Sequence, residues 1–419
     1  MKLLIQNLIL LAVIIYLFSD HTCSADYPSI YGHSSVLVND KLFIFGGNTD
    51  SGDLSKCIYY LNVTDPRQSL SRPLINPTSY LNYTIKIAWA TAVTYNSTIF
   101  LYGGKNQSID APANLYIFDS INLTLKDSYV PQNESRISMQ AVIDSKGKIY
   151  IFGGYNVPKF LSGSLPPSIT ILNSMIIINT ILYKNYSIVN TTSGIMGRAY
   201  YSATMLDDSI FYIGGIDSSY RSVKITNIIV YNTSTNQWAN INVNVTGSAI
   251  IENRYGHTAV LTPNNSSIII YGGVTDNGTL PDPQLFFLNT TLPYTWLIPP
   301  RDETYPLPSA FHTANIVGDY MIIAFGQTTN SVTSPTKSYN KIHLFDINAS
   351  TWVPENVTNP SLPSSMPTSQ SPPIDLVIVA VILCGIIAVV FLVIIICNRD
   401  RLERIIENFR RRHEREYIG

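Results

Sequence analysis

The chain has 419 residues, of which only 13% are charged, and its formal net charge is -1. A charge this close to zero supplies neither a basic field for nucleic acid nor an acidic solvating arm, so we expect no nucleic-acid partner. The four cysteines are too few for a disulfide-built domain, and a chain of this length can bury a core without such links.

Residues 1–25 have the features of a secretory signal peptide. Lys2 precedes a run rich in Leu, Ile and Val, and small residues end at Ala25, which favours cleavage close to that position. Gln6 and Asn7 interrupt the apolar run. A retained membrane anchor is therefore the weaker alternative.

Residues 26–356 repeat one arrangement, in which about four apolar residues precede a pair of glycines, at intervals of 50 to 61 residues. Periodicity on this scale is typical of repeat architectures. The sixth copy is degenerate, and we align Gly326 with the first glycine and Gln327 with the second. The glycines, to which we assign a structural role, are Gly46, Gly47, Gly103, Gly104, Gly153, Gly154, Gly214, Gly215, Gly272, Gly273 and Gly326.

Each unit is interpreted as two hairpins. In the first, Ser34–Val38 and Leu42–Phe45 flank turn residues that tolerate left-handed conformations. Later units add partly alternating segments such as 227–232 before Trp238. A four-stranded antiparallel sheet of this size cannot cover both of its own apolar faces, so neighbouring units must stack. Closing them into a ring would remove the need for capping units.

Three segments are predicted after the repeats. Residues 357–374 are rich in Pro, Ser and Thr and indicate an extended stalk. Residues 375–398 enclose an uncharged run, 376–397, long enough to cross a bilayer as a helix. Residues 399–419 contain several arginines, which places them in the cytoplasm by the positive-inside rule. Their amphipathic pattern suits either a membrane surface, a partner or a solvated helix.

The glycosylation acceptors agree with this topology, since every Asn-x-Ser/Thr triplet lies between the two apolar runs. Some triplets are expected by chance in a chain so rich in Asn, Ser and Thr. Cys23 would leave with the signal and Cys384 and Cys397 belong to the membrane segment, which leaves Cys57 as a packed thiol. The candidate acceptors are Asn62, Asn82, Asn96, Asn106, Asn122, Asn133, Asn185, Asn190, Asn232, Asn244, Asn264, Asn265, Asn277, Asn289, Asn348 and Asn356.

The glycine doublets, the Arg or aromatic residues before the first strands and the late Trp238, Trp296 and Trp352 resemble the kelch repeat family. The resemblance covers nearly the whole region between the apolar runs, although the first three units lack the late Trp. It implies an all-β, six-bladed β-propeller of four-stranded antiparallel blades, followed here by one C-terminal transmembrane helix. The propeller superfamily includes the central domain of galactose-oxidase-type enzymes.

Recognition through loops on one face is the common use of such a propeller. Candidate partner contacts are Arg136, Arg198, Tyr220, Arg221 and Arg254, with a structural hydrogen bond between blades as the stronger alternative for each arginine. The insert 156–168 is a further candidate. His33, His257 and His312 each precede a first strand, and we interpret them as hydrogen-bonding residues rather than metal ligands, because no carboxylate or thiolate recurs beside them.

The sequence lacks the phosphate-loop, dinucleotide, zinc-protease and nucleophile-elbow motifs. We therefore expect no catalytic residue, metal or cofactor. The expected function is that of a single-pass type I membrane glycoprotein, at the plasma membrane or in a secretory organelle, whose propeller binds a protein or glycan outside the cytoplasm. One alternative is a copper-radical oxidase, which the resemblance raises and which would need a Cys–Tyr crosslink. The other is a membrane scaffold acting through its cytoplasmic tail.

Overall fold

The computed structural model describes residues 27–70, 72–77, 85–106, 115–129, 136–156, 170–183, 186–247, 249–300, 306, 309–328 and 337–354. The chain divides into two units, Met1–Asn356 and Val357–Gly419, and every described residue belongs to the first. The predicted signal, stalk, membrane segment and cytoplasmic tail lie outside the described residues. Within the described ranges, no helix combines the length and the apolar character needed to cross a membrane.

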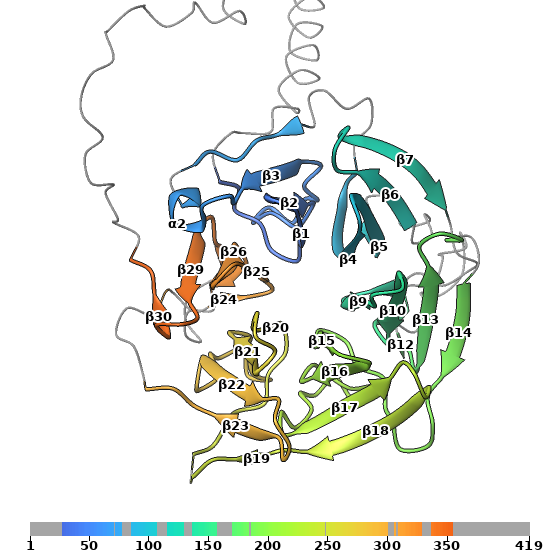
Figure 1. The fold of residues 1–419 in the computed structure, drawn as a ribbon, viewed down its shortest axis with the longest axis vertical. Helices are drawn as coiled ribbons and strands as arrows, with labels where there is room; N and C mark the ends of the chain where they lie inside the picture. Colours follow the sequence, from blue (N-terminus) through green and yellow to red (C-terminus); the bar gives the residue numbers. More distant parts are fainter. Residues whose placement is uncertain are drawn as a thin grey trace, which may run out of the picture. The chain divides into compact units, whose positions relative to one another are not determined.

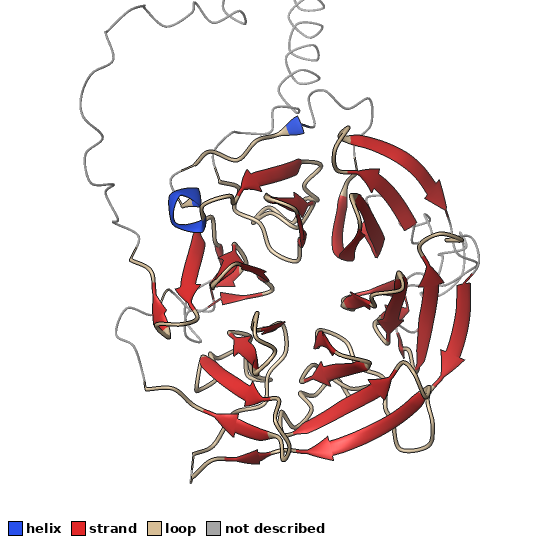
Figure 2. Cartoon of the chain, in the orientation of Figure 1, coloured by secondary structure: helices blue, strands red, loops and turns tan. Residues whose placement is uncertain are grey.

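Antiparallel sheets built on one plan make up this first unit (Figure 2). In each, an inner strand pairs with a second strand, and a third strand follows outward, usually with a fourth. The first half of the chain contributes β1 (Ser34–Val38), β2 (Lys41–Phe45), β3 (Ile58–Asn62); β4 (Ile87–Tyr95), β5 (Thr98–Asn106), β6 (Leu115–Asp119), β7 (Thr124–Tyr129); and β9 (Ala141–Ile143), β10 (Lys148–Phe152), β13 (Ser174–Asn179), β14 (Tyr186–Asn190).

The second half continues the plan, and we name each sheet by its inner strand. Its sheets are β15 (Ser202–Leu206), β16 (Ser209–Ile213), β17 (Asn227–Asn232), β18 (Gln237–Asn242); β20 (Thr258–Leu261), β21 (Ser267–Tyr271), β22 (Leu285–Asn289), β23 (Thr295–Leu297); and β25 (Thr313–Val317), β26 (Tyr320–Ala324), β29 (Ile342–Asp346), β30 (Thr351–Trp352).

The sheets close into a ring (Figure 1). Each inner strand contacts the inner strand of the next sheet in chain order, and β25 returns to β1. Buried apolar clusters fill the spaces between neighbouring sheets. The second strands are buried on both faces because a sheet packs against each of them, and Leu42–Phe45 are at most 1% exposed. Trp296 and Trp352 cap this core on fourth strands, as predicted.

Two sheets differ from the predicted four strands. The β1 sheet has three strands among the described residues, with an isolated bridge from Tyr60 to Ile75 outside them. The β20 sheet gains a fifth strand, β19 (Asn244–Val245), which pairs in parallel with β23. Strand β19 follows β18, the outer strand of the preceding sheet, and its pairing with β23 links the outer edges of these two sheets.

Small elements occupy the ring's periphery and one face. Two three-stranded sheets lie where the doublets are, formed by β8 (Arg136–Ile137), β11 (Tyr155–Asn156), β12 (Thr170–Ile171) and by β24 (Ser309–Ala310), β27 (Gln327–Thr328), β28 (Lys337–Ser338). The short helix α2 (Pro66–Ser69) begins after Asp65, whose carboxylate caps it.

The ring has two unlike faces. The inner strands begin, the second strands end and the glycine doublets follow at one face, which we call the doublet face. The tight turns between inner and second strands, such as those at Asn39 and Asp207, lie at the other, which we call the turn face. Both of these turn residues have positive φ, as the predicted hairpins require.

Candidate functional site

The glycine doublets join each sheet to the next. Gly154 donates its backbone N–H to the Arg198 carbonyl of the following sheet at 2.8 Å. A Cβ on Gly153 would lie 2.3 Å from that same oxygen, and both glycines have positive φ. The doublet is therefore needed because the neighbouring backbone occupies the space that a side chain would fill.

The degenerate copy corrects one predicted alignment. Gly326 donates its N–H to the Ile30 carbonyl, which is the bond that the second glycine of a doublet makes elsewhere. Phe325 stands at the first position, with φ +55°. The residue replaced in this copy is therefore the first glycine, by Phe325, and not the second by Gln327.

Three predicted contact residues are not accessible. Arg136, Arg198 and Arg254 are 0%, 5% and 0% exposed. Their guanidinium groups donate to the carbonyl of the first doublet glycine of their own sheet, at 3.1, 3.4 and 3.2 Å. Burial lowers the pKa of Arg198 to about 10 and of Arg254 to about 9, so both stay charged at neutral pH. The three guanidinium groups support the strand ends instead of contacting a partner. Their hydrogen bonds to the glycine carbonyls lie within one sheet and not between neighbouring sheets.

The histidines before the inner strands have the predicted hydrogen-bonding role at two positions. Nε2 of His33 lies 2.9 Å from the Thr313 hydroxyl, and Nε2 of His312 lies 3.0 Å from the Thr258 hydroxyl, each on the preceding sheet. Burial lowers the pKa of His33, His257 and His312 to about 3, so all three are neutral at physiological pH. Among the described residues, no cluster of three or more His, Cys, Asp or Glu could hold a metal ion.

A closed cycle of backbone hydrogen bonds surrounds the axis at the doublet face. It passes from one residue per sheet to the next, and each donates its N–H to the carbonyl of the residue before it, at 2.7 to 3.0 Å. All have positive φ. The members of the cycle are Gly32, Trp89, Ser138, Tyr200, Gly256 and Phe311.

Large and small side chains alternate around this cycle, and the large ones meet over the axis. Trp89, Tyr200 and Phe311 pack edge to face, with ring centroids 5.2 to 5.4 Å apart. A Cβ on Gly32 would lie 2.9 Å from the Trp89 ring, and one on Gly256 would lie 2.6 Å from Phe311. We call the three rings the aromatic plug, because they fill the axis at this face.

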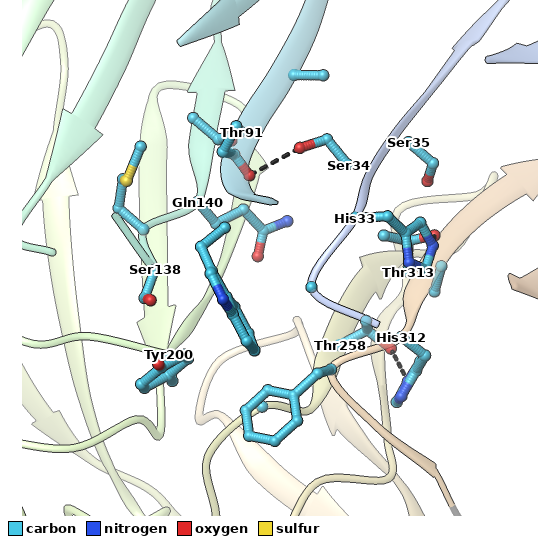
Figure 3. A pocket seen from close by; sticks show the side chains of 18 of the residues that line it. His33, Ser34, Ser35, Thr91, Ser138, Gln140, Tyr200, Thr258, His312 and Thr313 are labelled. Carbon is cyan, nitrogen blue, oxygen red and sulfur yellow. Dashed lines mark hydrogen bonds between the residues drawn. The ribbon is translucent and has the colours of Figure 1, made fainter. Parts of the chain in front are cut away.

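A cavity of about 160 Å³ lies between the inner strands, on the side of the plug that faces the interior of the ring (Figure 3). Its described lining is uncharged and mixed, with hydroxyl groups, the Gln140 amide and the three imidazoles beside alanine, methionine and aromatic side chains. Figure 3 shows His312 directed at Thr258, and His33 beside Thr313. All three imidazoles are neutral, and two of them, those of His33 and His312, are hydrogen-bonded to threonine hydroxyls through Nε2.

In front of the plug lies a second cavity of about 340 Å³, which we call the aromatic pocket. Tyr220 is 59% exposed and stacks on Tyr155, with centroids 6.1 Å apart and planes at 19°. Asp276 supplies a carboxylate, which accepts hydrogen bonds from the backbone N–H and the hydroxyl of Ser222. The described lining is Tyr155, Tyr200, Ile216, Tyr220, Tyr255, Asp276 and Phe311.

The sequence prediction found part of this pocket. Tyr220 lines it and Arg221 is exposed beside Tyr220, both on the loop that follows a doublet. Tyr155, Tyr255 and Asp276 were missed, although each follows a doublet or precedes an inner strand at a recurrent register. This recurrent position relative to the doublets and inner strands was the sequence signal that could have identified them. Of the insert 156–168, only Asn156 belongs to the described residues.

Cys57 corrects another expectation. It is disulfide-bonded and was predicted to be a packed thiol. The remaining cysteines, Cys23, Cys384 and Cys397, all lie outside the described residues. A thiol already held in a disulfide cannot form the Cys–Tyr crosslink that the oxidase alternative needs, so Cys57 does not support that alternative.

Comparison with solved structures supports the same fold. The structure of YjhT superposes with a TM-score of 0.54 at 11% identity and covers 78% of this chain and 98% of its own. At this identity the likeness concerns the fold alone.

Curated relatives match over short segments. Multiple epidermal growth factor-like domains protein 8 of Rattus norvegicus is 29% identical over 114 residues, which are 26% of this chain and 4% of the relative. Rho GTPase-activating protein gacHH of Dictyostelium discoideum is 30% identical over 94 residues, or 22% and 6% of the two chains. The matched segments thus span only a few per cent of these relatives.

A family model provides the broadest match by sequence. The model described as Attractin/LZTR1 beta-propeller matches residues 116–371, which is more than half of the chain. Its range includes the doublets from Gly153 to Gly326 and the buried arginines Arg136, Arg198 and Arg254. The chain therefore belongs to the Attractin/LZTR1 β-propeller family, a family of kelch-repeat propellers.

Proposed function

We propose that this chain is a non-enzymatic, single-pass membrane glycoprotein whose propeller binds a protein or glycan partner outside the cytoplasm through the doublet face. The aromatic pocket carries the proposal. It combines an exposed tyrosine, four further aromatic side chains and a carboxylate in a cavity on loops. Exposed aromatic residues set in a concave site are typical of binding surfaces.

We also propose that the ring has six blades. The six-membered cycle of backbone hydrogen bonds supports this number, because each sheet contributes one member and the first member, Gly32, donates to the last, Phe311. The continuous contact of the inner strands around the axis agrees with it.

The positions of the glycosylation acceptors favour the doublet face as the binding face. Hairpin turns and strand ends at the turn face carry Asn62, Asn96, Asn122, Asn232, Asn264, Asn265, Asn289 and Asn348, whereas Asn106, Asn190, Asn244 and Asn277 are the described acceptors at the doublet end. Glycans on the first group would cover the turn face and leave the aromatic pocket open.

Membrane attachment rests on the uncharged run 376–397 and the arginines after it. We propose that the propeller faces outward, at the plasma membrane or in a secretory organelle. Digestion of the full-length protein with a peptide N-glycosidase should increase its gel mobility. Absence of any shift would contradict an exported propeller.

Surface crosslinking tests the binding role. The full chain would be expressed on cells, crosslinked, and its partners recovered and quantified. We expect Tyr220→Ala to reduce specific partner recovery about thirtyfold, because hot-spot aromatic residues contribute about 2 kcal/mol or more. Leu292→Ala is the matched control, since Leu292 is 73% exposed at the turn face. Equal recovery with both variants would reject the pocket as the binding site.

A further inference from the structure

We propose that the aromatic pocket receives a cationic side chain of a partner protein, the ammonium group of a lysine or the guanidinium group of an arginine. This inference rests on the proposed partner binding and names the group that is bound.

The first step is the arrangement of the rings. Tyr155 lies between Tyr220 and Tyr200, with centroid distances of 6.1 and 5.7 Å, and the Tyr155–Tyr200 planes meet at 69°. Tyr200 continues to Tyr255 at 6.0 Å, and Tyr255 to Phe311 at the same distance. The rings therefore form a continuous wall with changing orientation. Such a wall offers several π faces, which attract a cation through the ring quadrupole.

The second step is charge. Asp276 is the one ionisable carboxylate among the described lining residues, and no lysine, arginine or histidine is in that lining. The position of the carboxylate is set, because the Ser222 N–H donates to Oδ1 at 2.8 Å and the Ser222 hydroxyl donates to the same atom. The pKa of Tyr255 is raised by burial and by the negative charge of Asp276, as expected for neighbours. The pocket thus repels anions and complements a cation.

The third step compares this ligand with a sugar. Sugars also stack on aromatic rings, but their hydroxyls are usually held by several amide or guanidinium donors in addition to carboxylates. The described lining contains no amide and no guanidinium group, and apart from tyrosine hydroxyls its polar side chain is Asp276. A cavity of about 340 Å³ accommodates one long side chain. These features favour a cationic side chain over a sugar.

The experiment compares two ligands of nearly the same shape. N-acetyl-arginine amide and N-acetyl-citrulline amide differ in charge, and the binding of each to the full chain in lipid nanodiscs would be followed by calorimetric titration. We expect millimolar affinity for the arginine compound and at least tenfold weaker binding of the citrulline compound. N-acetyl-lysine amide should bind within a few fold of the arginine compound.

Variants assign the effect to the pocket. Asp276→Asn keeps an acceptor for Ser222 and removes the charge, so arginine binding should weaken about fivefold. Tyr220→Ala should weaken it by a similar factor. Asp208→Asn is the matched control, because Asp208 lies in a turn at the turn face and should leave binding unchanged.

The result that overturns the inference is equal binding of the arginine and citrulline compounds, or arginine binding that neither variant weakens. Binding of a neutral oligosaccharide that requires Tyr220 would replace it with a sugar site. In either case, loss of partner recovery in Tyr220→Ala would still support the proposed function. Normal recovery in that variant, with charge-dependent arginine binding, would instead reject the proposed function and leave a cation site.

Discussion

Two interfaces between neighbouring sheets of the ring, which we call seams, are built from different interactions. At the seam between the β9 and β15 sheets, which are consecutive in the chain, Phe152 packs against Tyr201, Tyr212 and Trp238 at centroid distances of 4.9 to 6.1 Å. This contact is predominantly apolar and aromatic, although the two sheets also share backbone hydrogen bonds and bonds from a side chain to backbone through Tyr201 and Gln140.

The closing seam, between the β25 and β1 sheets, also buries an apolar cluster but adds hydrogen bonds that join two side chains. Asn315 donates to the Ser35 hydroxyl at 2.6 Å, and Arg67 donates to the Tyr320 hydroxyl at 2.6 Å. The backbone N–H and the hydroxyl of Ser338 both donate to Asp50 at 2.6 Å. These pairs join residues more than 250 positions apart in sequence.

The difference shows how a ring of similar units can close in register. Consecutive sheets are held near one another by a short connection, so non-directional apolar packing is sufficient there. The chain ends must find each other across the whole domain, and directional hydrogen bonds discriminate between the correct edge and the similar edges of other sheets.

Gly153→Val should have the largest effect, because it places a side chain into the seam between the β9 and β15 sheets. The new Cβ would lie 2.3 Å from the Arg198 carbonyl, in a residue with φ +60°. We expect a loss of more than about 4 kcal/mol in the free energy of unfolding. Gly194→Val separates the two causes, since Gly194 has φ +86° and open space around it; its loss should be about 1–2 kcal/mol. Chemical denaturation measures both, and similar losses would argue against the clash.

Phe325 occupies the equivalent position at the closing seam. Its side chain is 1% exposed and packs near Tyr27 and His33. Phe325→Ala should cost about 3 kcal/mol by leaving a cavity. Phe325→Gly should cost no more than that, because glycine relieves the positive φ and this offsets its greater flexibility.

Phe118 provides the control for the relative stability of the alanine and glycine variants at Phe325. It is equally buried on β6, where glycine has no conformational advantage, so Phe118→Gly should be less stable than Phe118→Ala. The same order at both positions would mean that the backbone at Phe325 is not strained.

The repeat pattern was sufficient to predict an all-β ring, because paired glycines, hairpin turns and late tryptophans depend on local backbone geometry. It also placed Tyr220 on an exposed loop. It left two roles open for three arginines, a partner contact and, as the stronger alternative, a structural hydrogen bond, because an arginine before a strand has the same sequence signature whether its guanidinium faces solvent or a buried carbonyl. It missed Asp276 and Tyr155, because the aromatic pocket is assembled from loops of different units. Ring closure, which single-chain periodicity does not encode, creates the plug and the pocket together.

The histidines predict that acid weakens the closing side of the ring first. The pKa of His33 and His312 is about 3 when folded and near 6.5 in an unfolded chain. The unfolded state therefore binds more protons below about pH 6.5, and stability falls as the pH decreases toward 3. Each histidine should cost about 2 kcal/mol between pH 7 and pH 5.

Hydrogen exchange at the two pH values would locate this loss. We expect faster exchange in the β1, β15, β20 and β25 sheets, because His257 packs against the β15 sheet, and little change in the β9 sheet, which has Met139 at the corresponding register. His33→Gln should reduce the pH dependence of unfolding by about one proton. A pH dependence that His33→Gln leaves unchanged would place the titrating group elsewhere.

The smallest effect concerns a contact present at two seams. Asp50 accepts two hydrogen bonds from Ser338 at the closing seam, and Asp276 accepts the same pair from Ser222 between consecutive sheets. Asp50→Ala and Asp276→Ala should each cost about 1 kcal/mol in global unfolding, since both bonds are exposed. If the closing seam opens before the rest of the ring, Asp50→Ala should also speed hydrogen exchange in the β1 and β25 sheets severalfold, because no covalent connection limits their separation. Asp276→Ala should produce no such local effect, and equal local exchange in the two variants would show that the ring opens as one cooperative unit.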